Sequence, residues 1–392
     1  MKLPKEVVII DYLRSPFSRS RPQEPEKDVF NNVRMDEVAA ILVNEIIKRT
    51  KIDPKEIDEC ITGTARPQGE TATGGGRFPV LLAKLPLNVA GHGIDSACGS
   101  SLTALRTAVM TIGCDFAETI FVLGIENMNR EPVRAPSKKF GTQEYDYLDM
   151  RTAGNMGLTA EKLYKQTKFS RKDMDEFALR SHQLAMRAQK EGYFKHEIVP
   201  VEVTLSDGSK QIIDNDICIR GDTTLESLMH LKPAYKLDGE ITAGNSSPRN
   251  AGAAAMLVMS RDKAKKLGLR PMASFISFGM EGVDPSIMGI GPVPASRNAL
   301  EYAGLKVEDI DWWEINEAFS IVPLNAIAEL GIDSEKVNVK GGAIAIGHPL
   351  GASGVRLVGT LARILKLKGG TYGLATMCCG MGQGVATIVK KE

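Results

Sequence analysis

The sequence predicts an α/β fold. Three observations support this prediction: short strand-like runs alternate with helical patterns, the same order recurs in the last third of the chain, and the segment between does not follow it. In the first third, β-rich runs at residues 7–11, 59–63 and 119–123 are separated by helical patterns at residues 35–51 and 102–112. Such alternation of strands and helices is typical of βαβ units.

The recurrence is visible in the letters of the sequence as well as in its pattern. Ile-Asp at residues 57–58 precedes one strand-like run and Ile-Asp at residues 310–311 precedes another, an offset of 253 residues. The same offset carries Cys98 onto Gly351, so that ACGSS falls on LGASG. We therefore expect two similar halves, each a layered βαβ unit, whose corresponding loops meet at a shared seam.

The chain is long enough for more than one packed unit, because single cores stop growing at roughly 250–300 residues and this chain has 392. We expect an N-terminal half from residues 1–124 with 246–270 and a C-terminal half from residues 271–392. Residues 125–245 are expected to form an inserted lobe over the seam. This segment contains MNREPVRAPSKKF, a long helical stretch near residues 159–190 and a polar run around SDGSK.

The overall composition excludes functions that depend on a strong electrostatic field. Lys and Arg number 49 against 48 Asp and Glu, so the chain has no general attraction for nucleic acid or an anionic membrane. The apolar run in the N-terminal MKLPKEVVII is too short for a signal peptide, and no stretch approaches the ~20 apolar residues of a membrane span. A cytoplasmic location is expected. Six cysteines are too few for a disulfide scaffold and fit no zinc signature, which favours free thiols and no metal site.

Cys98 is the first candidate for chemistry. It lies between a strand-like approach, AGHGIDSA, and a helical run, GSSLTALRTAVMTI. This places the sulfur at a helix N-terminus, where free amide groups and the helix dipole are expected to favour the nucleophilic thiolate. The neighbouring Ala97, Gly99 and Ser100 are small enough to let a substrate approach. A small buried cysteine without chemistry is the alternative interpretation.

A second segment, GGAIAIGHPLGASG at residues 341–354, surrounds His348 with glycines and then opens a helical run. Glycine-rich loops lose much backbone entropy on folding, which indicates that another group approaches closely. His348 is a candidate general base for a nearby thiol. The alternatives are a core histidine beside a tight turn and a phosphate-binding loop, although the spacing matches no nucleotide-binding fingerprint.

Two further segments lie where strands end. GLATMCCGMGQG, at residues 373–384, breaks into a glycine-rich turn at Cys378. The thiol is a candidate proton shuttle, and the amides of the neighbouring glycines are candidate oxyanion donors. The alternatives are buried thiols, a redox pair with Cys379, and half of a metal site. EINEAF, at residues 314–319, has Asn316 at a strand end. Asn316 is a candidate to orient a water or to donate to a carbonyl oxygen, and the alternative is a turn or helix cap.

Together, in this order and spacing, the four segments resemble the thiolase family over essentially the whole chain. The inserted lobe takes part, since MGLTAEKL and EFALRSHQLAMRAQKEGYFKHEIVPV are similar to the family's lobe helices. The resemblance implies a thiolase-like layered αβαβα fold from two similar βαβ halves with pseudo-two-fold symmetry and an inserted loop lobe. It also implies that coenzyme A is a substrate and that no cofactor is tightly bound.

The resemblance assigns catalytic roles residue by residue. Cys98 matches the nucleophile that takes the acyl group, and His348 matches the base that activates it. Cys378 matches the acid that protonates the leaving acetyl-CoA carbanion in cleavage, or the base that deprotonates acetyl-CoA in condensation. Asn316 matches the residue that holds a water, which forms one oxyanion hole with His348. The backbone amides of Cys98 and Gly380 are expected to form the other.

The same resemblance suggests where the substrate binds. Arg220 and Ser227, in IRGDTTLESL, and Ser247, in ITAGNSS, match coenzyme A contacts, and Arg220 suits an adenine or phosphate contact. Met156 in the lobe motif and Phe319 in EINEAF are expected to line the substrate site. An ordinary surface-loop position is the alternative for each of the three coenzyme A residues.

Several stretches resemble the degradative branch in particular: NNVRMDEVAA, ACGSSLTAL, DPSIMGIGPVPAS and TMCCGMGQGVATIV. Asn155 precedes Met156, where the acetoacetyl-specific branch usually has histidine. The prediction is a 3-ketoacyl-CoA thiolase (acetyl-CoA C-acyltransferase) of fatty acid β-oxidation, which works through an acyl-cysteine intermediate in cleavage or in the reverse Claisen condensation. The alternatives are an acetoacetyl-specific acetyl-CoA C-acetyltransferase and a thiolase for a branched, aromatic or dicarboxylic acyl group. The second is suggested by three departures from the family pattern, at Pro248, Ala251 and Cys379.

Two rival functions stand beside a thiolase. A decarboxylating ketoacyl synthase of the same superfamily uses a cysteine with two histidines, and Cys378 stands where the second histidine is needed. A non-catalytic scaffold that binds coenzyme A is the other, although all reactive positions are present. Thiolases form dimers and often tetramers, so a homodimer or homotetramer is expected. A hydratase-dehydrogenase subunit is a further partner that the degradative branch sometimes has.

Overall fold

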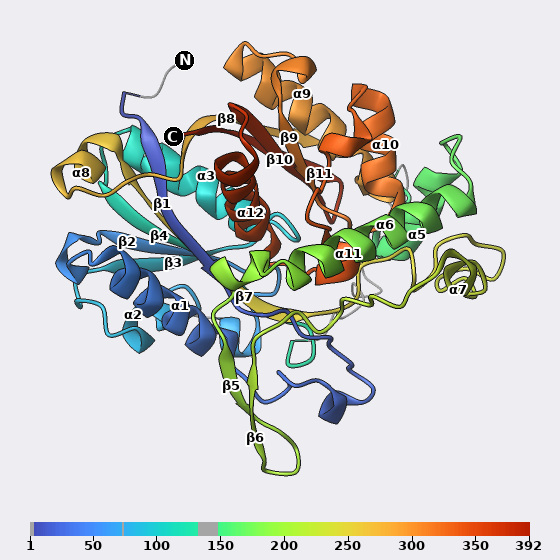
Figure 1. The fold of residues 1–392 in the computed structure, drawn as a ribbon, viewed down its shortest axis with the longest axis horizontal. Coiled ribbons are helices and arrows are strands. Elements are labelled where there is room, and N and C mark those ends of the chain that lie inside the picture. Colours follow the sequence, from blue (N-terminus) through green and yellow to red (C-terminus); the bar gives the residue numbers. More distant parts are fainter. Residues whose placement is uncertain (1–3, 73, 132–147) are drawn as a thin grey trace.

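One β-sheet runs through the whole molecule. The structure is a computed structural model that describes residues 4–72, 74–131 and 148–392. PVRAPSKKF, residues 132–140 of the expected inserted lobe, lies outside the described residues. Within the described part, nine strands form the main sheet in the order β3-β2-β4-β7-β1-β8-β11-β10-β9 (Figure 1). A separate pair, β5 (Val201–Thr204) and β6 (Lys210–Ile213), forms a hairpin around SDGS.

The strands of the main sheet are β1 (Val7–Arg14), β2 (Glu59–Gly63), β3 (Ala90–Ile94), β4 (Thr119–Asn127), β7 (Ala251–Ser260), β8 (Ala273–Gly282), β9 (Trp312–Ile315), β10 (Tyr372–Cys379) and β11 (Gln383–Lys391). The three strands expected in the first third are thus confirmed as β1, β2 and β4. The two halves of the sheet join where β1 pairs with β8 through only two residue pairs, Val8 with Ser274 and Ile9 with Ala273.

Helices cover the sheet in layers. They are α1 (Met35–Thr50), α2 (Phe78–Leu82), α3 (Ser100–Gly113), α4 (Met150–Ala153), α5 (Met156–Tyr164), α6 (Arg171–Lys190), α7 (Leu225–Met229), α8 (Arg261–Lys266), α9 (Pro292–Ala303), α10 (Ile321–Leu330), α11 (Ala343–Ile346) and α12 (Ser353–Lys368). One apolar core packs α3 and α12 between the two halves of the sheet. A second core lies under α1, α2 and α8, and a third under α9 and α10. This arrangement confirms the αβαβα layering.

The repeat seen in the sequence is also present in the secondary structure. The starts of β2 and β9, of β4 and β10, and of α3 and α12 each differ by the 253 residues that relate the two Ile-Asp pairs. Asp58 Oδ2 accepts the backbone N–H groups of residues 118 and 119 at 2.8 and 2.9 Å. Asp311 Oδ2 accepts those of residues 371 and 372 at 2.6 and 3.0 Å. The same carboxylate therefore holds the start of the same strand in both halves.

The two halves differ in the element that precedes the central helix. β3 precedes α3, whereas the equivalent stretch before α12 is the short helix α11.

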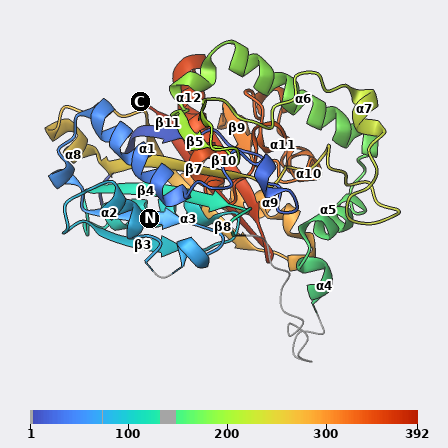
Figure 2. The same cartoon turned by 90° about the horizontal axis from the view of Figure 1, so that it is seen from below.

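The expected long helical stretch near residues 159–190 is wrong, because it is two helices. α5 ends at its C-cap Lys165, and α6 begins where Ser170 and Asp173 form a reciprocal capping box. Figures 1 and 2 place α5, α6 and α7 together at one end of the molecule, against α10 and α11.

The central helices meet at their N-termini. The backbone N–H of Val355 donates to Ser101 Oγ at 3.1 Å. A Cβ on Gly354 would lie 2.4 Å from the backbone nitrogen of Leu102, so that only glycine permits this approach. The turn before α3 carries Cys98 and the turn before α12 carries His348. The helix contact thus brings the two candidate catalytic turns to one seam.

No helix in the described ranges is both long enough and apolar enough to cross a membrane.

Candidate active site

The Cys98 turn is held in an unusual backbone conformation. Ala97 has a φ of +48°, in the left-handed region that residues with a Cβ adopt only at a cost of order 1–2 kcal/mol. Ser100 compensates by donating its hydroxyl to Ala97 O at 2.6 Å and accepting the Ser96 N–H at 2.9 Å. The turn places the Cys98 side chain, 7% exposed, two residues ahead of α3. Its own backbone N–H and that of Gly380 both donate toward the sulfur.

The expectation that the helix N-terminus favours the Cys98 thiolate is wrong for the unliganded site. Burial raises the pKa of Cys98 to about 11, and the charge of Glu126 acts in the same direction. The amide of Gly380 and the guanidinium of Arg66 lower the pKa by less. Removing a thiolate from water therefore outweighs the helix terminus, and the thiol is protonated until a base takes its proton.

His348 is oriented by two hydrogen bonds. Ser353 donates its hydroxyl to Pro349 O at 2.9 Å, and the same Oγ lies 2.6 Å from His348 Nδ1. Because the only hydroxyl hydrogen of Ser353 is already used, His348 Nδ1 must be the donor of the second bond. His348 Nε2 is then the acceptor, and Asn316 Nδ2 lies 3.3 Å from it. The ring is therefore held in the tautomer that leaves Nε2 basic.

The electrostatic surroundings keep His348 neutral. Burial lowers the pKa of His348 to about 3, and the positive charge of Arg356 adds to the effect. Asn250 fixes the backbone at this point, since its Oδ1 accepts the His348 N–H at 2.6 Å. A Cβ on the preceding Gly347, which has a φ of +118°, would lie 2.6 Å from the Asn250 amide. At neutral pH the imidazole is therefore uncharged.

Asn316 contacts both His348 and β10, the strand that ends in Cys378 and Cys379. It follows the end of β9, and its backbone N–H donates to Thr376 O at 3.0 Å, two residues before Cys378. Asn316 Oδ1 is buried and has no hydrogen-bond partner among the described residues. A buried amide oxygen of this kind suits a bound water. The structure therefore brings Asn316 and His348 together, beside the strand that ends in Cys378.

Cys378 and Cys379 end β10 and are both fully buried. Burial raises the pKa of each thiol, and the charge of Cys98 raises both further. Cys378 packs in an apolar cluster with Phe319. Cys379 faces the other way, since a Cβ on Gly99 would lie 2.4 Å from its sulfur. The two neighbouring thiols therefore have different surroundings, and both belong to the Cys98 site.

The predicted substrate residues surround the same apolar cluster. Met156, at the start of α5, has its sulfur near Gly380, where a Cβ would lie 3.6 Å from it. Phe319 packs edge to face on Tyr235 with ring centroids 6.0 Å apart. Ser247 donates both its backbone N–H and its hydroxyl to Ala318 O at 3.0 Å. Met156, Phe319 and Ser247 thus gather near Cys378.

Arg220 and Ser227 belong to the outer part of the lobe. The backbone N–H of Arg220 donates to His182 Nδ1 at 3.2 Å. Burial lowers the pKa of the Arg220 guanidinium, and the neighbouring positive charge of Arg19 lowers it further. Ser227 takes part in a capping box with Thr224 at the start of α7. No described contact joins these two residues to Cys98.

Sequence patterns did not reveal several residues that position the site. Glu317 is buried and accepts the Ser181 hydroxyl at 2.6 Å, the Asn338 amide at 2.8 Å and the Ile344 N–H at 3.1 Å. It therefore ties α6 to the segment that leads into His348. Ser353 and Asn250 act on His348 directly. The serine five residues after the histidine in GHPLGAS was the only local signal for any of them.

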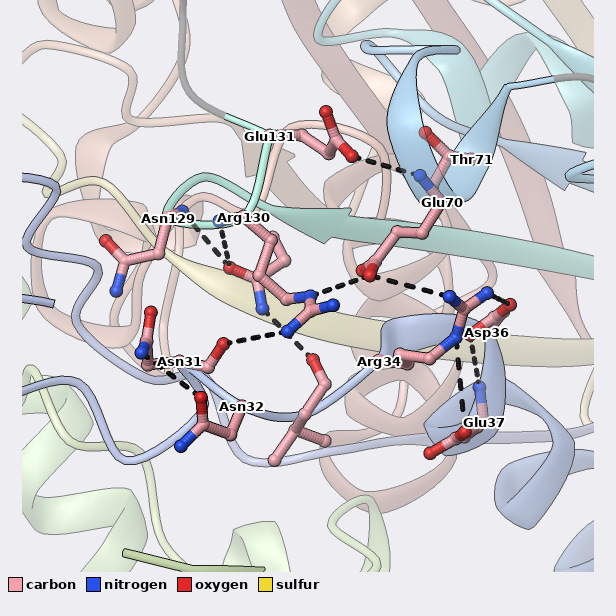
Figure 3. A network of polar contacts seen from close by, with 12 residues as sticks. Asn31, Asn32, Arg34, Asp36, Glu37, Glu70, Thr71, Asn129, Arg130 and Glu131 are labelled. Carbon is pink, nitrogen blue, oxygen red and sulfur yellow. Dashed lines mark hydrogen bonds and ion pairs between the residues drawn. The ribbon is translucent and has the colours of Figure 1, made fainter. Parts of the chain in front are cut away.

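A polar cavity of about 590 Å³ lies elsewhere, between the start of α1 and the residues after β4 (Figure 3). Arg130 Nε donates to Glu70 Oε2 at 2.6 Å, and Glu131 accepts the Glu70 N–H at 3.0 Å. Arg34 bonds Asp36 at 2.6 Å. These contacts pair the charges with one another and hold the loop after β2. The network is separate from the site that contains Cys98 and His348. In the same described ranges, no three His, Cys, Asp or Glu side chains gather in a way that suits a metal ion.

Comparison with known proteins agrees with this geometry. Family models described as "Thiolase, N-terminal domain" and "Thiolase, C-terminal domain" match residues 7–262 and 269–391. A 3-ketoacyl-CoA thiolase of Marinobacter nauticus is 42% identical over 98% of both chains, and one of Hahella chejuensis matches to the same extent. The solved human mitochondrial 3-ketoacyl-CoA thiolase superposes with a TM-score of 0.90 at 34% identity, covering all of both chains. A Bacillus anthracis acetyl-CoA acetyltransferase superposes equally well at 36% identity, again over both chains in full.

Replacement of Ser353 by alanine tests the orientation of His348. We expect Ser353→Ala to lower kcat by about 10- to 100-fold, because a lost buried hydrogen bond of ~1–3 kcal/mol frees the ring to adopt the wrong tautomer. KM should stay within about twofold. Steady-state kinetics at several pH values provides the measurement. The matched control is Ser277→Ala, which removes a buried hydroxyl that donates to Ala299 O at 2.6 Å, away from the histidine. Equal kinetics for the two variants would contradict the assignment.

Proposed function

The chain belongs to the thiolase family and is an acyltransferase, and on that basis we propose that it acts as a 3-ketoacyl-CoA thiolase. The observation that carries the proposal is the pairing of two turns at one seam: a protonated thiol with two amides directed at its sulfur, and a neutral histidine whose Nε2 is unprotonated. The full-length relatives at 41–42% identity are named 3-ketoacyl-CoA thiolase. This favours the degradative branch over an acetoacetyl-specific acetyltransferase.

In the first half of the reaction, the Cys98 sulfur attacks the keto carbon of the 3-ketoacyl-CoA while His348 takes the thiol proton. Because Cys98 and His348 are both uncharged at rest, transfer of the proton accompanies formation of the carbon-sulfur bond. The bond between the keto carbon and the α carbon then breaks. The acyl group remains on Cys98 as a thioester, and the electron pair passes to the enolate of acetyl-CoA.

Stabilisation of the enolate and of the tetrahedral oxygen needs two groups of donors. We assign the amides of Cys98 and Gly380 to one and His348, with a water on Asn316, to the other. Such donors act strongly in a buried site, since they are already oriented when the charge develops. Cys378 donates its proton to the α carbon of the enolate. Its raised pKa suits this role, because a protonated thiol is the form required.

In the second half, coenzyme A enters as the acyl acceptor. Its thiol gives its proton to the Cys378 thiolate left by the first half and attacks the acyl-Cys98 thioester. The carbon-sulfur bond to Cys98 breaks, acyl-CoA leaves, and the imidazolium of His348 returns its proton to the Cys98 sulfur. Coenzyme A is therefore a substrate. A complex of the human mitochondrial relative with CoA has been solved, which supports this part of the proposal.

Thiolytic cleavage across a panel of 3-ketoacyl-CoAs, from acetoacetyl to long-chain and aromatic, tests the function. We expect cleavage of medium or long chains, and a loss of at least about 10³-fold in kcat for Cys98→Ser and Cys378→Ser. Cys114→Ser is the control, because Cys114 is an exposed free thiol outside the site. Cleavage of acetoacetyl-CoA alone would move the protein to the acetyltransferase branch. Full activity of Cys378→Ser would refute the role of that thiol.

For coenzyme A we propose that Arg220 contacts a phosphate, with Ser227 and Ser247 nearby along the bound molecule. The mutual repulsion of Arg19 and Arg220 supports this, since a phosphate beside them relieves it. We expect Arg220→Gln to raise KM for CoA about tenfold, equivalent to ~1.4 kcal/mol, with kcat within about twofold. The control is Arg297→Gln, because Arg297 is exposed and donates only to the backbone oxygen of Glu329; it should change neither KM nor kcat. An unaltered KM in Arg220→Gln would exclude the contact.

We further propose that the protein is a homodimer or a tetramer of such dimers that works in the cytoplasm. β3 is an exposed edge of the main sheet, and beside it Phe78, Leu82 and Leu87 are 41%, 42% and 80% exposed. Edge strands and exposed apolar groups are usually covered, and a second copy would do so symmetrically. All six cysteines are free thiols, which supports a reducing compartment.

Light scattering on the purified protein should give two or four times the 42.5 kDa chain mass, and Leu87→Lys should shift the mass towards one chain. Leu367→Lys, at an exposed leucine on α12, is the control. A monomeric wild-type protein would refute the assembly. A larger complex that contains a second polypeptide in cytoplasmic extracts would identify a hydratase-dehydrogenase or other accessory subunit.

A further inference from the structure

Glu126 is a buried carboxylate that the mechanism above does not use. It lies near the end of β4 and is 1% exposed. Its Oε2 accepts the backbone N–H groups of Ala65 and Gly351, both at 3.0 Å. Ala65 follows β2 in the N-terminal half, and Gly351 lies between His348 and α12 in the C-terminal half. One carboxylate thus bridges the two halves beside the catalytic histidine.

The same carboxylate lies close to the Cys98 turn. Gly124, two residues earlier on β4 and therefore on the same face of the strand, would place a Cβ 2.9 Å from Ser101 Cβ and 2.4 Å from Gly351 O. Ser101 belongs to the first turn of α3, directly after the cysteine. The negative charge of Glu126 accordingly acts on Cys98, where it opposes the thiolate.

The internal repeat shows what is special about this residue. The offset of 253 residues carries Glu126 onto Cys379 and Cys98 onto Gly351. As Glu126 contacts the turn before α12, so Cys379 contacts the turn before α3, at Gly99. The C-terminal turn is therefore held by a carboxylate and the N-terminal turn by an uncharged thiol.

The charged surroundings of Glu126 are few. Burial has the largest effect and raises the pKa of Glu126 to about 7; the amides of Ala65 and Gly351 and the charge of Arg66 lower it, and Asp95 raises it. Around Cys98 the other titratable groups are Arg66 and the thiols of Cys378 and Cys379. Across the seam, the imidazole of His348 stays neutral. Of these groups, Glu126 is the one whose charge changes near neutral pH.

The charge network of Figure 3 keeps this arrangement in place. Glu131 and Arg130 hold Glu70 through contacts of 3.0 and 2.6 Å. Glu70 lies on the loop after β2 that begins with Ala65 and Arg66. The partners of Glu126 are therefore fixed from outside the site.

We propose that Glu126 is a positioning residue with an electrostatic role: it holds the His348 turn through Gly351 and, when ionised, keeps Cys98 protonated until His348 takes the proton. This inference rests on the proposed function, since it concerns the thiol that carries the acyl group. Charge on Glu126 restrains the thiolate above neutral pH, where thiols elsewhere become reactive towards oxidants and alkylating agents.

The rate of alkylation of Cys98 by iodoacetamide, followed by mass analysis of its peptide as a function of pH, tests the proposal. Glu126→Gln retains an oxygen that accepts both amides but carries no charge. We expect its alkylation profile to shift to lower pH by about half a unit or more, which is about threefold faster labelling at pH 8. Glu202→Gln, which removes an exposed carboxylate paired with Lys210 on the β5–β6 hairpin, should leave the profile unchanged. Glu126→Ala should in addition lower kcat about tenfold relative to Glu126→Gln, because Gly351 loses its partner.

The wild-type protein provides a second measurement that does not depend on folding of a variant. As Glu126 ionises near pH 7, the logarithm of the alkylation rate should flatten there before rising again. A uniform tenfold rise per pH unit, or an unshifted profile in a folded Glu126→Gln protein, would overturn the proposal. Failure of the proposed function is distinguishable, because wild-type protein would then neither cleave ketoacyl-CoA nor form an acyl-Cys98 peptide.

Discussion

The close approach of α3 and α12 is the constraint on which the rest of the structure depends. Gly354 lies against the backbone of Leu102, and Val355 donates to Ser101, so that the helices touch where both begin. Each helix is preceded by a turn that carries a reactive side chain. A methyl group on Gly354 would clash with Leu102 and push apart the two N-termini whose preceding turns carry Cys98 and His348.

Burial at this seam has opposite effects on the two groups for which we propose proton exchange. It raises the pKa of Cys98 and lowers that of His348, so the resting pair is uncharged. An uncharged pair needs less stabilisation in a dry interior than a thiolate and an imidazolium. The amides and the Asn316 side chain are instead placed for the charge that appears only during reaction.

Much of the fold could be predicted because its signals are local or repeated. The bounds of β2 follow from a short β-rich run. The repeated Asp58 and Asp311 each accept a backbone N–H at the start of a strand, one in each half. The break between α5 and α6 was missed because no glycine or proline marks residues 165–170; the capping box of Ser170 and Asp173 at the start of α6 is the local signal. The Glu126 contact was also missed, because Gly351 is 225 residues away in the sequence.

The sequence alone determined which residues are candidates for the chemistry: a cysteine before one helix, a histidine before its repeat, and two cysteines where a strand turns. Only the tertiary structure decided their protonation. The direction of a pKa shift is the balance between loss of water and nearby charge, and neither can be evaluated until the chain is packed. A helix terminus visible in the sequence suggested a thiolate at Cys98. The depth of its burial and the neighbouring Glu126, both products of the folded seam, keep it a thiol.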